Sequence, residues 1–311
     1  MRLDDYDLTS ATGGPSNADA VGRAAAGAAL KDTIETALDR AEATASDVAA
    51  AVLAVAGSVT VAVGEEVVAE ASLGGAYVVN DVVAAWAAGT LCQPGIGIIS
   101  GTGSHVFGVN ASHESWRVGG WGHILGDEGS AYWLGLEALK ASLAYRDGSG
   151  PETCLLERAT EAFELKGIED LPELFYGKPL TKADVARFAK EVFAAAETGD
   201  GVARALFDEA GEQLATQAAA AVRALGMEQE RFPIALVGST FRAGRLLQEP
   251  LERALRRVAR HAFFRVAEVP PVAGSVLLGV RAAGGWERFD ETAFLTAVKR
   301  DLEAEDVVTP R

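Results

Sequence analysis

The chain has 311 residues, of which 49% are hydrophobic, and this is enough for a sizeable core in one large or two ordinary domains. Its 44 acidic and 28 basic residues leave a formal net charge of −16, which disfavours a nucleic-acid backbone or an anionic membrane as a partner. The acidic start MRLDDYDLTS has no apolar signal region, and the longest apolar runs are too short to span a bilayer. Cys92 and Cys154 form no CxxC pair and no zinc pattern, so we expect reduced thiols in a cytoplasmic protein. From the charge we expect no nucleic-acid or membrane partner.

The first third of the chain alternates helical patterns with short apolar runs. Helical spacing predicts a helix from residue 18, over ADAVGRAAAGAALKDTIETALDRAEA. VAAAVLAVAG, ending at Gly57, and AYVVND, ending at Asp81, are typical of buried parallel strands, and VVAAWAAG predicts a short helix after the second. GIGIISGTGSHVFGVN then predicts a hairpin with GTG at its tip.

The rest of the chain is mostly helical by pattern. GSAYWLGLEALKASLAYRD predicts a helix, residues 151–226 are predicted to be nearly all helical, and TKAD begins one helix with a threonine cap. FPIALVGST at 232–240 predicts a buried strand, followed by the helix FRAGRLLQEPLERALRRVARH, in which Pro250 kinks or restarts the helix and the arginines form a solvated face. AFFRVAEV predicts a last strand, GSVLLGVRAAGG a core helix and ETAFLTAVKRDLEAED a surface helix. The alternation predicts an α/β protein with mainly parallel sheets.

Two strands end in polar residues, VVND and VGST, and α/β folds bind ligands at such ends. Two of them suggest two lobes that face one cleft. Asp81 could accept a proton from a bound hydroxyl, although by itself it is better explained as a helix N-cap. The turn in VGSTFRAG could hold a flat base against its backbone, or it could be a plain strand-to-helix connection.

Two glycine-rich segments are candidates for ligand contact. In SGTGSH, 100–105, the amides around Thr102 can form an anion nest, although an ordinary hairpin turn explains this segment slightly better when it is taken alone. In GGWGHILGDEGSAYW, 119–133, the glycines let backbone groups approach a polar ligand, Trp121 could form an apolar wall and Asp127 could accept hydrogen bonds from hydroxyls. Asp127 and Glu128 also suit the start of the next helix, and Tyr132 and Trp133 are expected in the core.

The histidines give weaker signals. His123 is better explained as a structural histidine than as a base, whereas His105 could contact a ligand because it adjoins the GTGS loop. No spacing predicts a metal site formed by the protein.

These four segments in this order resemble the N-acetylglucosamine kinase family, in the BadF/BadG/BcrA/BcrD-type branch of the sugar kinase, actin and heat-shock chaperone ATPase superfamily. The resemblance runs from about Gly14 to Gly285, and SGTGS followed by GGWGHILGDEGSAYW is its most specific part. It implies two ribonuclease-H-like α/β domains around a cleft, ATP and Mg²⁺ as cofactors, and attack of an amino sugar's 6-hydroxyl on the γ-phosphate. Relatives are often dimers, which implies a homodimer.

The resemblance also implies roles for individual residues. Asp81 matches the catalytic base. The positions that match nucleotide-binding residues are Gly101, Thr102, Gly103, Gly238, Ser239 and Ala243. The positions that match sugar-binding residues are Asn17, Ser104, His105, Gly120, Trp121, Gly122, His123 and Asp127. His105 stands where some relatives have asparagine, which puts that sugar contact in doubt.

The sequence departs from the family at its N-terminal side. Relatives begin with a strand and a first phosphate loop of the type DGGGTKT, which is missing before LDDYDLTSATGGPSN, and the stretch between Gly57 and Asp81 is shorter than usual, so a helix there is trimmed. We expect that the true start lies upstream of Met1, a degenerate paralogue being the alternative. The expected domains are an incomplete N-terminal domain over 1–93, joined by a C-terminal helix at 290–311, and an ATPase domain over 94–289.

The sequence therefore predicts an ATP-dependent kinase that acts on the 6-hydroxyl of N-acetylglucosamine or a related hexosamine. One alternative is a catalytically impaired paralogue, or a regulator that binds sugar or nucleotide. An activator ATPase of the dehydratase type ranks last, because such proteins carry clustered cysteines and Cys92 and Cys154 are isolated.

Overall fold

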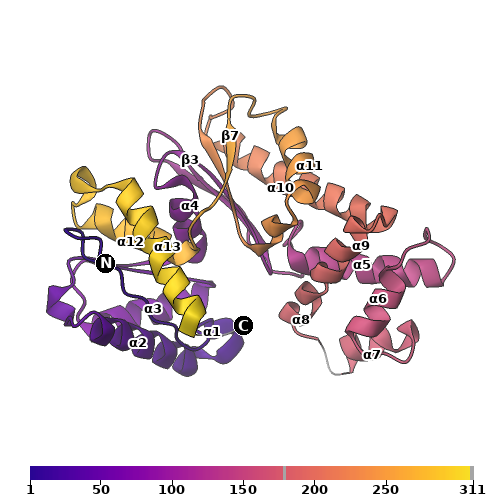
Figure 1. Cartoon of the computed structure of the whole chain (residues 1–311), viewed down its shortest axis with the longest axis horizontal. Coiled ribbons are helices and arrows are strands. Elements are labelled where there is room, and N and C mark those ends of the chain that lie inside the picture. Colours follow the sequence, from indigo (N-terminus) through magenta and orange to yellow (C-terminus); the bar gives the residue numbers. More distant parts are fainter. Residues whose placement is uncertain (178–179, 309–311) are drawn as a thin grey trace. The chain divides into compact units, whose positions relative to one another are not determined.

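The chain forms two compact units (Figure 1). The structure is a computed structural model that describes residues 1–177 and 180–308. Unit 1 comprises residues 1–93 and the chain from 267 onward, and unit 2 comprises residues 94–266. Residues 267–289, which we expected in the second domain, therefore belong to unit 1. The reason is that helix α12 (Pro271–Ala282) packs on α4 (Asp81–Thr90) and on strand β1 (Ala51–Val55).

Unit 1 is built around one parallel strand pair in its described part. β1 pairs in register with β2 (Ala76–Asn80), and α3 (Ser58–Ala71) connects the two strands. The predicted first helix is present but breaks at Gly22, which has a φ of 83° and separates α1 from α2. The remaining helices are α1 (Ala18–Val21), α2 (Arg23–Arg40), η1 (Ala45–Asp47), η4 (Trp286–Arg288) and α13 (Glu291–Val308). Residues 309–311 of the predicted C-terminal helix lie outside the described residues.

Unit 2 contains a five-stranded sheet, in the order β5-β4-β3-β6-β7. Strands β3, β4 and β5 form an antiparallel meander, and β6 and β7 continue the sheet parallel to β3. This is the strand arrangement of a ribonuclease-H-like domain. The strands are β3 (Gly95–Ser100), β4 (Ser104–Val109), β5 (Ser115–Gly119), β6 (Pro233–Val237) and β7 (Phe263–Val266). The predicted hairpin and strands are thus confirmed, whereas β5, which is short and exposed, was not predicted.

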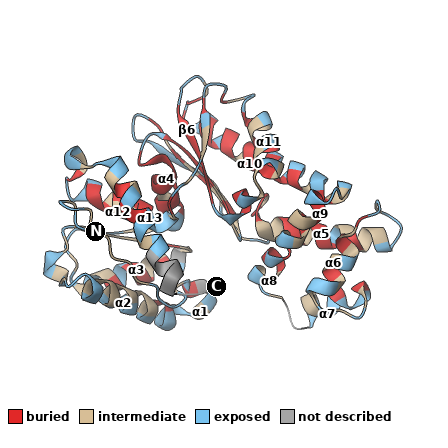
Figure 2. Cartoon of the chain, in the orientation of Figure 1, coloured by how far each residue is buried: buried red, intermediate tan, exposed pale blue. Residues whose placement is uncertain are grey.

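Helices cover this sheet and form the rest of unit 2. The long helix α10 (Gly201–Ala224) contacts β3, β4 and β5, and it also packs against α11 (Arg245–Leu255). The others are α5 (Ala131–Arg146), α6 (Leu155–Ala162), η2 (Ile168–Asp170), α7 (Leu171–Tyr176), α8 (Lys182–Arg187), α9 (Ala189–Glu197) and η3 (Ser239–Ala243). Buried residues recur along α10 (Figure 2) and belong to one core cluster with residues of β3, β4 and β6, as an amphipathic helix on a sheet requires.

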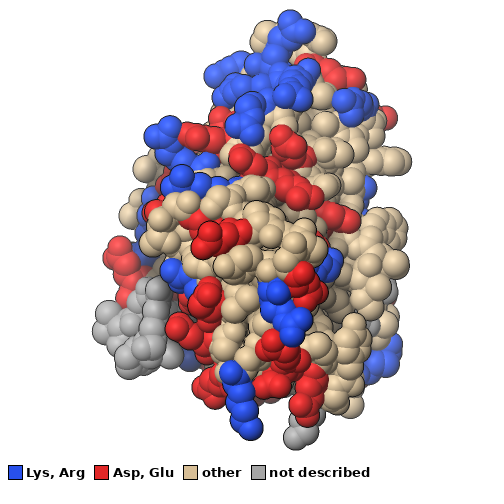
Figure 3. Space-filling view, turned by 90° about the vertical axis from the view of Figure 1, so that its right-hand side faces the viewer, with Lys and Arg blue, Asp and Glu red and all other residues tan. Residues whose placement is uncertain are grey.

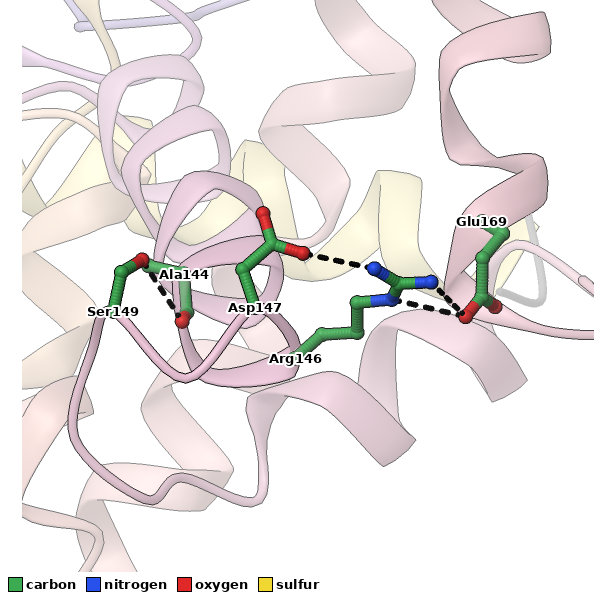
Figure 4. Close-up of polar contacts among 5 residues, drawn as sticks. All are labelled: Ala144, Arg146, Asp147, Ser149 and Glu169. Atoms are coloured by element: carbon green, nitrogen blue, oxygen red, sulfur yellow. Dashed lines mark hydrogen bonds and ion pairs between the residues drawn. The ribbon is translucent and has the colours of Figure 1, made fainter.

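Local contacts fix the helix ends in unit 2. The predicted threonine cap is confirmed, because Thr181 and Asp184 form a reciprocal capping box at the start of α8. At the end of α5, the Arg146 guanidinium donates to Glu169 Oε1 over 3.0 and 2.9 Å and to Asp147 over 3.0 Å, which ties α5 to η2 (Figure 4). These groups are exposed, so the contact orients the turn more than it stabilises the fold.

The basic stretch at 252–261 is only partly helical. α11 runs through Pro250 and ends at Leu255, so Arg256 and Arg257 follow the helix rather than extend its face. Figure 3 shows basic side chains gathered at the upper end of the face in view, and below them acidic side chains interspersed with further basic ones. Among the described residues, no helix is long and apolar enough to cross a membrane.

Candidate functional site

Two loops of unit 2 meet at the carboxyl ends of the inner strands β3 and β6. β3 and β6 are parallel neighbours, so the GTG turn after Ser100 and the Gly-Ser turn after Val237 emerge side by side. The Thr240 hydroxyl donates to the Gly101 carbonyl over 3.3 Å and links the two turns directly. The predicted nucleotide-binding residues of both loops are thus brought together, although they are far apart in the sequence.

A pocket of about 410 Å³ opens beside these two loops. Its lining includes three of the predicted nucleotide-binding residues together with apolar and basic side chains: Thr102, Ser239 and Ala243, then Leu134, Phe193 and Phe207, then Lys190 and Arg242. Within the part of the chain that the structure describes, neither Lys190 nor Arg242 forms an ion pair. Apolar walls with hydroxyls and uncompensated positive charge suit a ligand that combines a flat ring with anionic groups.

The GTG turn is also hydrogen-bonded to the segment that carries Asp127. Four bonds join them: Ser104 N–H to Asp127 Oδ1 over 3.1 Å, Ser104 Oγ to Glu128 O over 2.8 Å, Ser100 Oγ to Gly129 O over 2.9 Å, and Ala131 N–H to Gly101 O over 2.9 Å. The two glycine-rich motifs therefore form one connected structure.

Asp127 is the central charged residue of this structure. Its side chain is almost fully buried, its φ is 66°, and its Oδ2 lies 2.6 Å from the Lys182 ammonium. It does not cap the next helix, because the N-cap of α5 is Ser130, whose hydroxyl accepts a hydrogen bond from Trp133 N–H over 3.1 Å. A buried carboxylate that is not needed as a cap is available to bind a ligand hydroxyl.

His105 packs against the backbone of Gly120. The φ of Gly120 is 72°, and a Cβ at this position would lie 2.5 Å from the imidazole Cε1, so a residue with a side chain does not fit. Burial and, to a smaller extent, the Arg117 guanidinium lower the pKa of His105 to about 4, although Asp127 acts in the opposite direction. The imidazole is therefore neutral at pH 7.

The exposed part of the glycine segment follows Gly120. Trp121 is 66% exposed and stacks against Arg117, with the guanidinium carbon 5.6 Å from the ring centroid. His123 is also exposed and meets the Tyr132 ring edge-on, at 5.0 Å between centroids. Tyr132 and Trp133 pack, partly buried, against the core as predicted. The Trp121 ring is thus free to cover a ligand.

Sequence reasoning missed Gln217, on the sheet-facing side of α10. Its Nε2 donates to the Glu128 carbonyl over 3.3 Å, and its Oε1 is buried without a partner. His105 Nε2 and Asp127 Oδ2 are the other buried side-chain atoms without a well-aligned hydrogen bond among the described residues, so all three adjoin the glycine segment. Buried polar atoms are normally paired, and their concentration here marks a site for a polar ligand or water. Nothing in the local sequence around Gln217 signals this position.

Asp81 and Asn17 lie in unit 1. The N-cap of α4 is Asn80, whose side chain accepts from Val82 N–H over 3.3 Å, so Asp81 is the first helical residue and not the cap. Desolvation by the surrounding protein raises the pKa of Asp81, and the backbone amides of Val82 and Asp81 oppose this effect. Asn17 directly precedes α1, which is held to α3 by a 2.9 Å hydrogen bond from Ala18 N–H to Thr60 Oγ1. Because β1 and β2 are parallel, α3 and Asp81 both begin at the same edge of that sheet.

Residues 3–279 match the model of the BadF/BadG/BcrA/BcrD ATPase family. A curated N-acetylmuramic acid/N-acetylglucosamine kinase from Clostridium acetobutylicum is 38% identical over 53% of this chain and 54% of its own length. A curated N-acetyl-D-glucosamine kinase from Dictyostelium discoideum is 30% identical over 65% of each chain. This chain thus spans about half to two thirds of the length of the curated relatives that it matches.

Two solved structures are similar over most of the chain. One is a candidate N-acetylglucosamine kinase from Chromobacterium violaceum, which is 27% identical over 86% of this chain and 88% of its own, with a TM-score of 0.68. The other, from Porphyromonas gingivalis and described in the same way, is 21% identical over 83% of this chain and 85% of its own, with a TM-score of 0.62. The second likeness concerns the fold alone. The predicted α/β fold class is confirmed.

Proposed function

This chain belongs to the BadF/BadG/BcrA/BcrD ATPase family, and on that basis we propose that it is an ATP-dependent kinase that phosphorylates the 6-hydroxyl of N-acetylglucosamine or a related hexosamine. Both curated relatives are named as N-acetylglucosamine kinases, and the one from Clostridium acetobutylicum also acts on N-acetylmuramic acid by name. A cytoplasmic location and a homodimer remain predictions.

The observation that carries the proposal is the pocket beside the two loops that follow the carboxyl ends of β3 and β6. Leu134, Phe193 and Phe207 suit the faces of an adenine ring, and Thr102 and Ser239 offer hydroxyls to the ribose or the phosphates. The turn Gly101–Gly103 would hold the phosphate chain through the amides of Thr102 and Gly103, because the Gly101 amide already donates to the Gly103 carbonyl over 2.9 Å.

The chemistry requires positioning and one proton acceptor. In the proposed reaction, Asp81 accepts the proton of the sugar 6-hydroxyl while the sugar 6-oxygen bonds to the γ-phosphorus. The bond from that phosphorus to the β-phosphate oxygen breaks, and ADP leaves. Asn17 and the unit 2 residues Ser104, His105, Gly120, Trp121, Gly122, His123 and Asp127 are proposed to hold the sugar.

Mg²⁺ would accompany ATP and neutralise charge on its phosphates. The described residues contain no cluster of three or more His, Cys, Asp or Glu side chains that could hold a metal ion. Mg²⁺ commonly keeps several water ligands and binds mainly through substrate phosphates, so in the proposed reaction it would arrive with the nucleotide.

The proposal is tested by a sugar panel. The protein is incubated with MgATP and N-acetylglucosamine, glucosamine, N-acetylmuramic acid or glucose, and ADP release and the ³¹P spectrum of the sugar product are recorded. We expect sugar-dependent ADP release and a 6-phosphate signal with at least one amino sugar. Sugar and nucleotide binding without ADP release would replace the kinase with a binding protein.

Asp81→Asn should separate binding from turnover. Loss of a general base typically costs about 10²–10⁴ in rate, so kcat should fall by that factor while the affinity for ATP stays unchanged. The matched control is Asp32→Asn, an exposed aspartate on α2 in the same unit, which should behave as wild type. An Asp81→Asn protein as active as wild type would remove Asp81 from the mechanism.

A further inference from the structure

Lys182 is the first residue of α8, and its ammonium reaches into the candidate site. Its Nζ lies 2.6 Å from Asp127 Oδ2, and the Lys182 side chain is 32% exposed while that of Asp127 is 4% exposed. The lysine therefore meets a buried carboxylate from the solvent side. Neither composition nor spacing singled it out, because Thr181 and Asp184 explain the local sequence as a helix start.

The ammonium also lies directly against the GTG turn. A Cβ on Gly103 would lie 2.8 Å from Lys182 Nζ and 2.8 Å from Asp127 Oδ1, so only glycine leaves room for this ion pair. Lys182 thus stands at the junction of two groups: the turn proposed to hold the phosphate chain, and the aspartate proposed to hold the sugar. In a kinase, the transferred phosphoryl group passes between those two.

The ion pair with Asp127 does not use all of the hydrogen-bond donors of the Lys182 ammonium. An ammonium has three N–H donors, and within the described chain its only partner is Asp127. Asp127 Oδ1 already accepts the Ser104 amide, and α8 has its own cap, so the carboxylate and the helix have support without the two remaining donors. A compact, partly exposed cation with free donors beside an anion-binding turn suits a phosphate oxygen.

We propose that Lys182 binds the terminal phosphate of the nucleotide, holding it on the GTG turn and stabilising the charge that spreads over the transferred phosphoryl group. Asp127 orients the ammonium from behind through the ion pair. This inference rests on the proposed function, because it assigns the γ-phosphate to that turn. Positioned charge of this kind is the main source of rate enhancement in phosphoryl transfer.

The first test compares nucleotides that differ only in the terminal phosphate. Calorimetry gives the affinities for MgATP and MgADP of the wild type and of Lys182→Met. We expect the wild type to bind ATP more tightly than ADP, and Lys182→Met to lose about tenfold of that preference because one charge-assisted contact is gone. The control is Lys140→Met, an exposed lysine of α5 paired with Glu137, which should keep the wild-type ratio. An unchanged ratio in Lys182→Met would overturn the proposal.

Removing Lys182 also leaves Asp127 buried without its counter-charge, so an effect through Asp127 must be separated from a phosphate contact. Asp127→Asn keeps Lys182 but removes the carboxylate that orients it, so this variant should retain more of the preference for ATP over ADP than Lys182→Met does, whatever it does to the sugar. Adding Lys182→Met to Asp127→Asn removes both charges, keeps the buried site neutral and should lower the preference about tenfold, as Lys182→Met does alone. If the double variant keeps it, Lys182 has only a structural role.

The two proposals fail in different ways. In the kinase assay, Lys182→Met should lower kcat about 100-fold, which is typical for one lost stabilising donor. If the wild type phosphorylates sugar and Lys182→Met does so at the same rate, only the role of Lys182 is refuted. If the wild type phosphorylates no sugar but Lys182→Met still loses the preference for ATP, the sugar-kinase proposal fails and the phosphate contact stands. If the wild type binds neither nucleotide, both are refuted.

Discussion

His105 illustrates how burial decides the chemistry of a single residue. Its position beside the GTGS loop suggested ligand contact, but the sequence could not tell whether the imidazole is charged. Burial beneath Gly120, together with the Arg117 guanidinium, lowers its pKa from 6.5 to about 4. A neutral imidazole has one N–H donor and one acceptor nitrogen, so it can substitute for the amide of an asparagine in holding a sugar hydroxyl.

The lowered pKa of His105 predicts a specific pH dependence of stability. Below pH 6.5 the imidazole of the unfolded chain binds a proton, whereas that of the folded chain does so only near pH 4. The free energy of unfolding therefore has its full value from this residue above pH 6.5 and decreases as the pH falls toward 4. His105→Asn should therefore show a smaller drop in Tm between pH 7 and 4.5 than the wild type does. His113→Asn, at an exposed histidine, is the control and should follow the wild-type curve. Coincident curves for all three proteins would contradict burial of His105.

At the scale of elements, the sequence predicted residues 119–133 as a ligand loop. It did not predict strand β5, which ends at Gly119, where this loop begins. β5 pairs with β4, so His105 lies directly opposite Gly119, and the next residue, Gly120, turns over the imidazole. The strand was missed because only its neighbour in the sheet gives it a ladder of hydrogen bonds, while its own side chains are largely exposed.

Two glycines with the same φ test this arrangement. Gly120 and Gly148 both have a φ of 72°, but a Cβ at Gly148 meets nothing within 4 Å, whereas at Gly120 it meets the His105 ring. Gly148→Ala should cost about 1–2 kcal/mol of unfolding free energy from backbone strain, and Gly120→Ala a further ~1–3 kcal/mol from the clash. Urea unfolding measures both. Equal losses would mean that His105 does not pack on Gly120.

At the scale of the whole molecule, the candidate residues are divided between two units. Asp81 and Asn17 belong to unit 1, and every proposed nucleotide-binding residue belongs to unit 2. Unit 2 holds the two loops proposed to bind nucleotide on one sheet, and it has its own core of buried side chains from the strands and α10. Nucleotide recognition is therefore expected to be a property of unit 2.

Hydrogen exchange with MgATP and no sugar tests this division. Backbone amides in 100–104 and 238–243 should exchange more slowly when nucleotide is bound, because the loops gain contacts and open less often. Amides of α2 in unit 1 serve as the internal reference and should exchange at unchanged rates. Protection that appears only in unit 1 would place the nucleotide elsewhere.

Local sequence determined the type of most elements and the two glycine-rich motifs. Apolar periodicity and capping residues act over a few neighbouring positions. The strands that end at Val55, Asn80 and Val237 and the cap at Thr181 could therefore be predicted from the local sequence. The resemblance to a known family likewise depends on short motifs that stand intact in the chain.

The tertiary structure decided which distant residues meet. The Lys182–Asp127 ion pair, the contact of Gln217 with Glu128 and the packing of α12 on α4 join segments that no local spacing relates. Helix and strand patterns specify which face of an element is buried but not its partner, because apolar burial is non-directional. Partners are chosen only when close packing and the pairing of buried polar groups are satisfied together, and that happens across the whole fold.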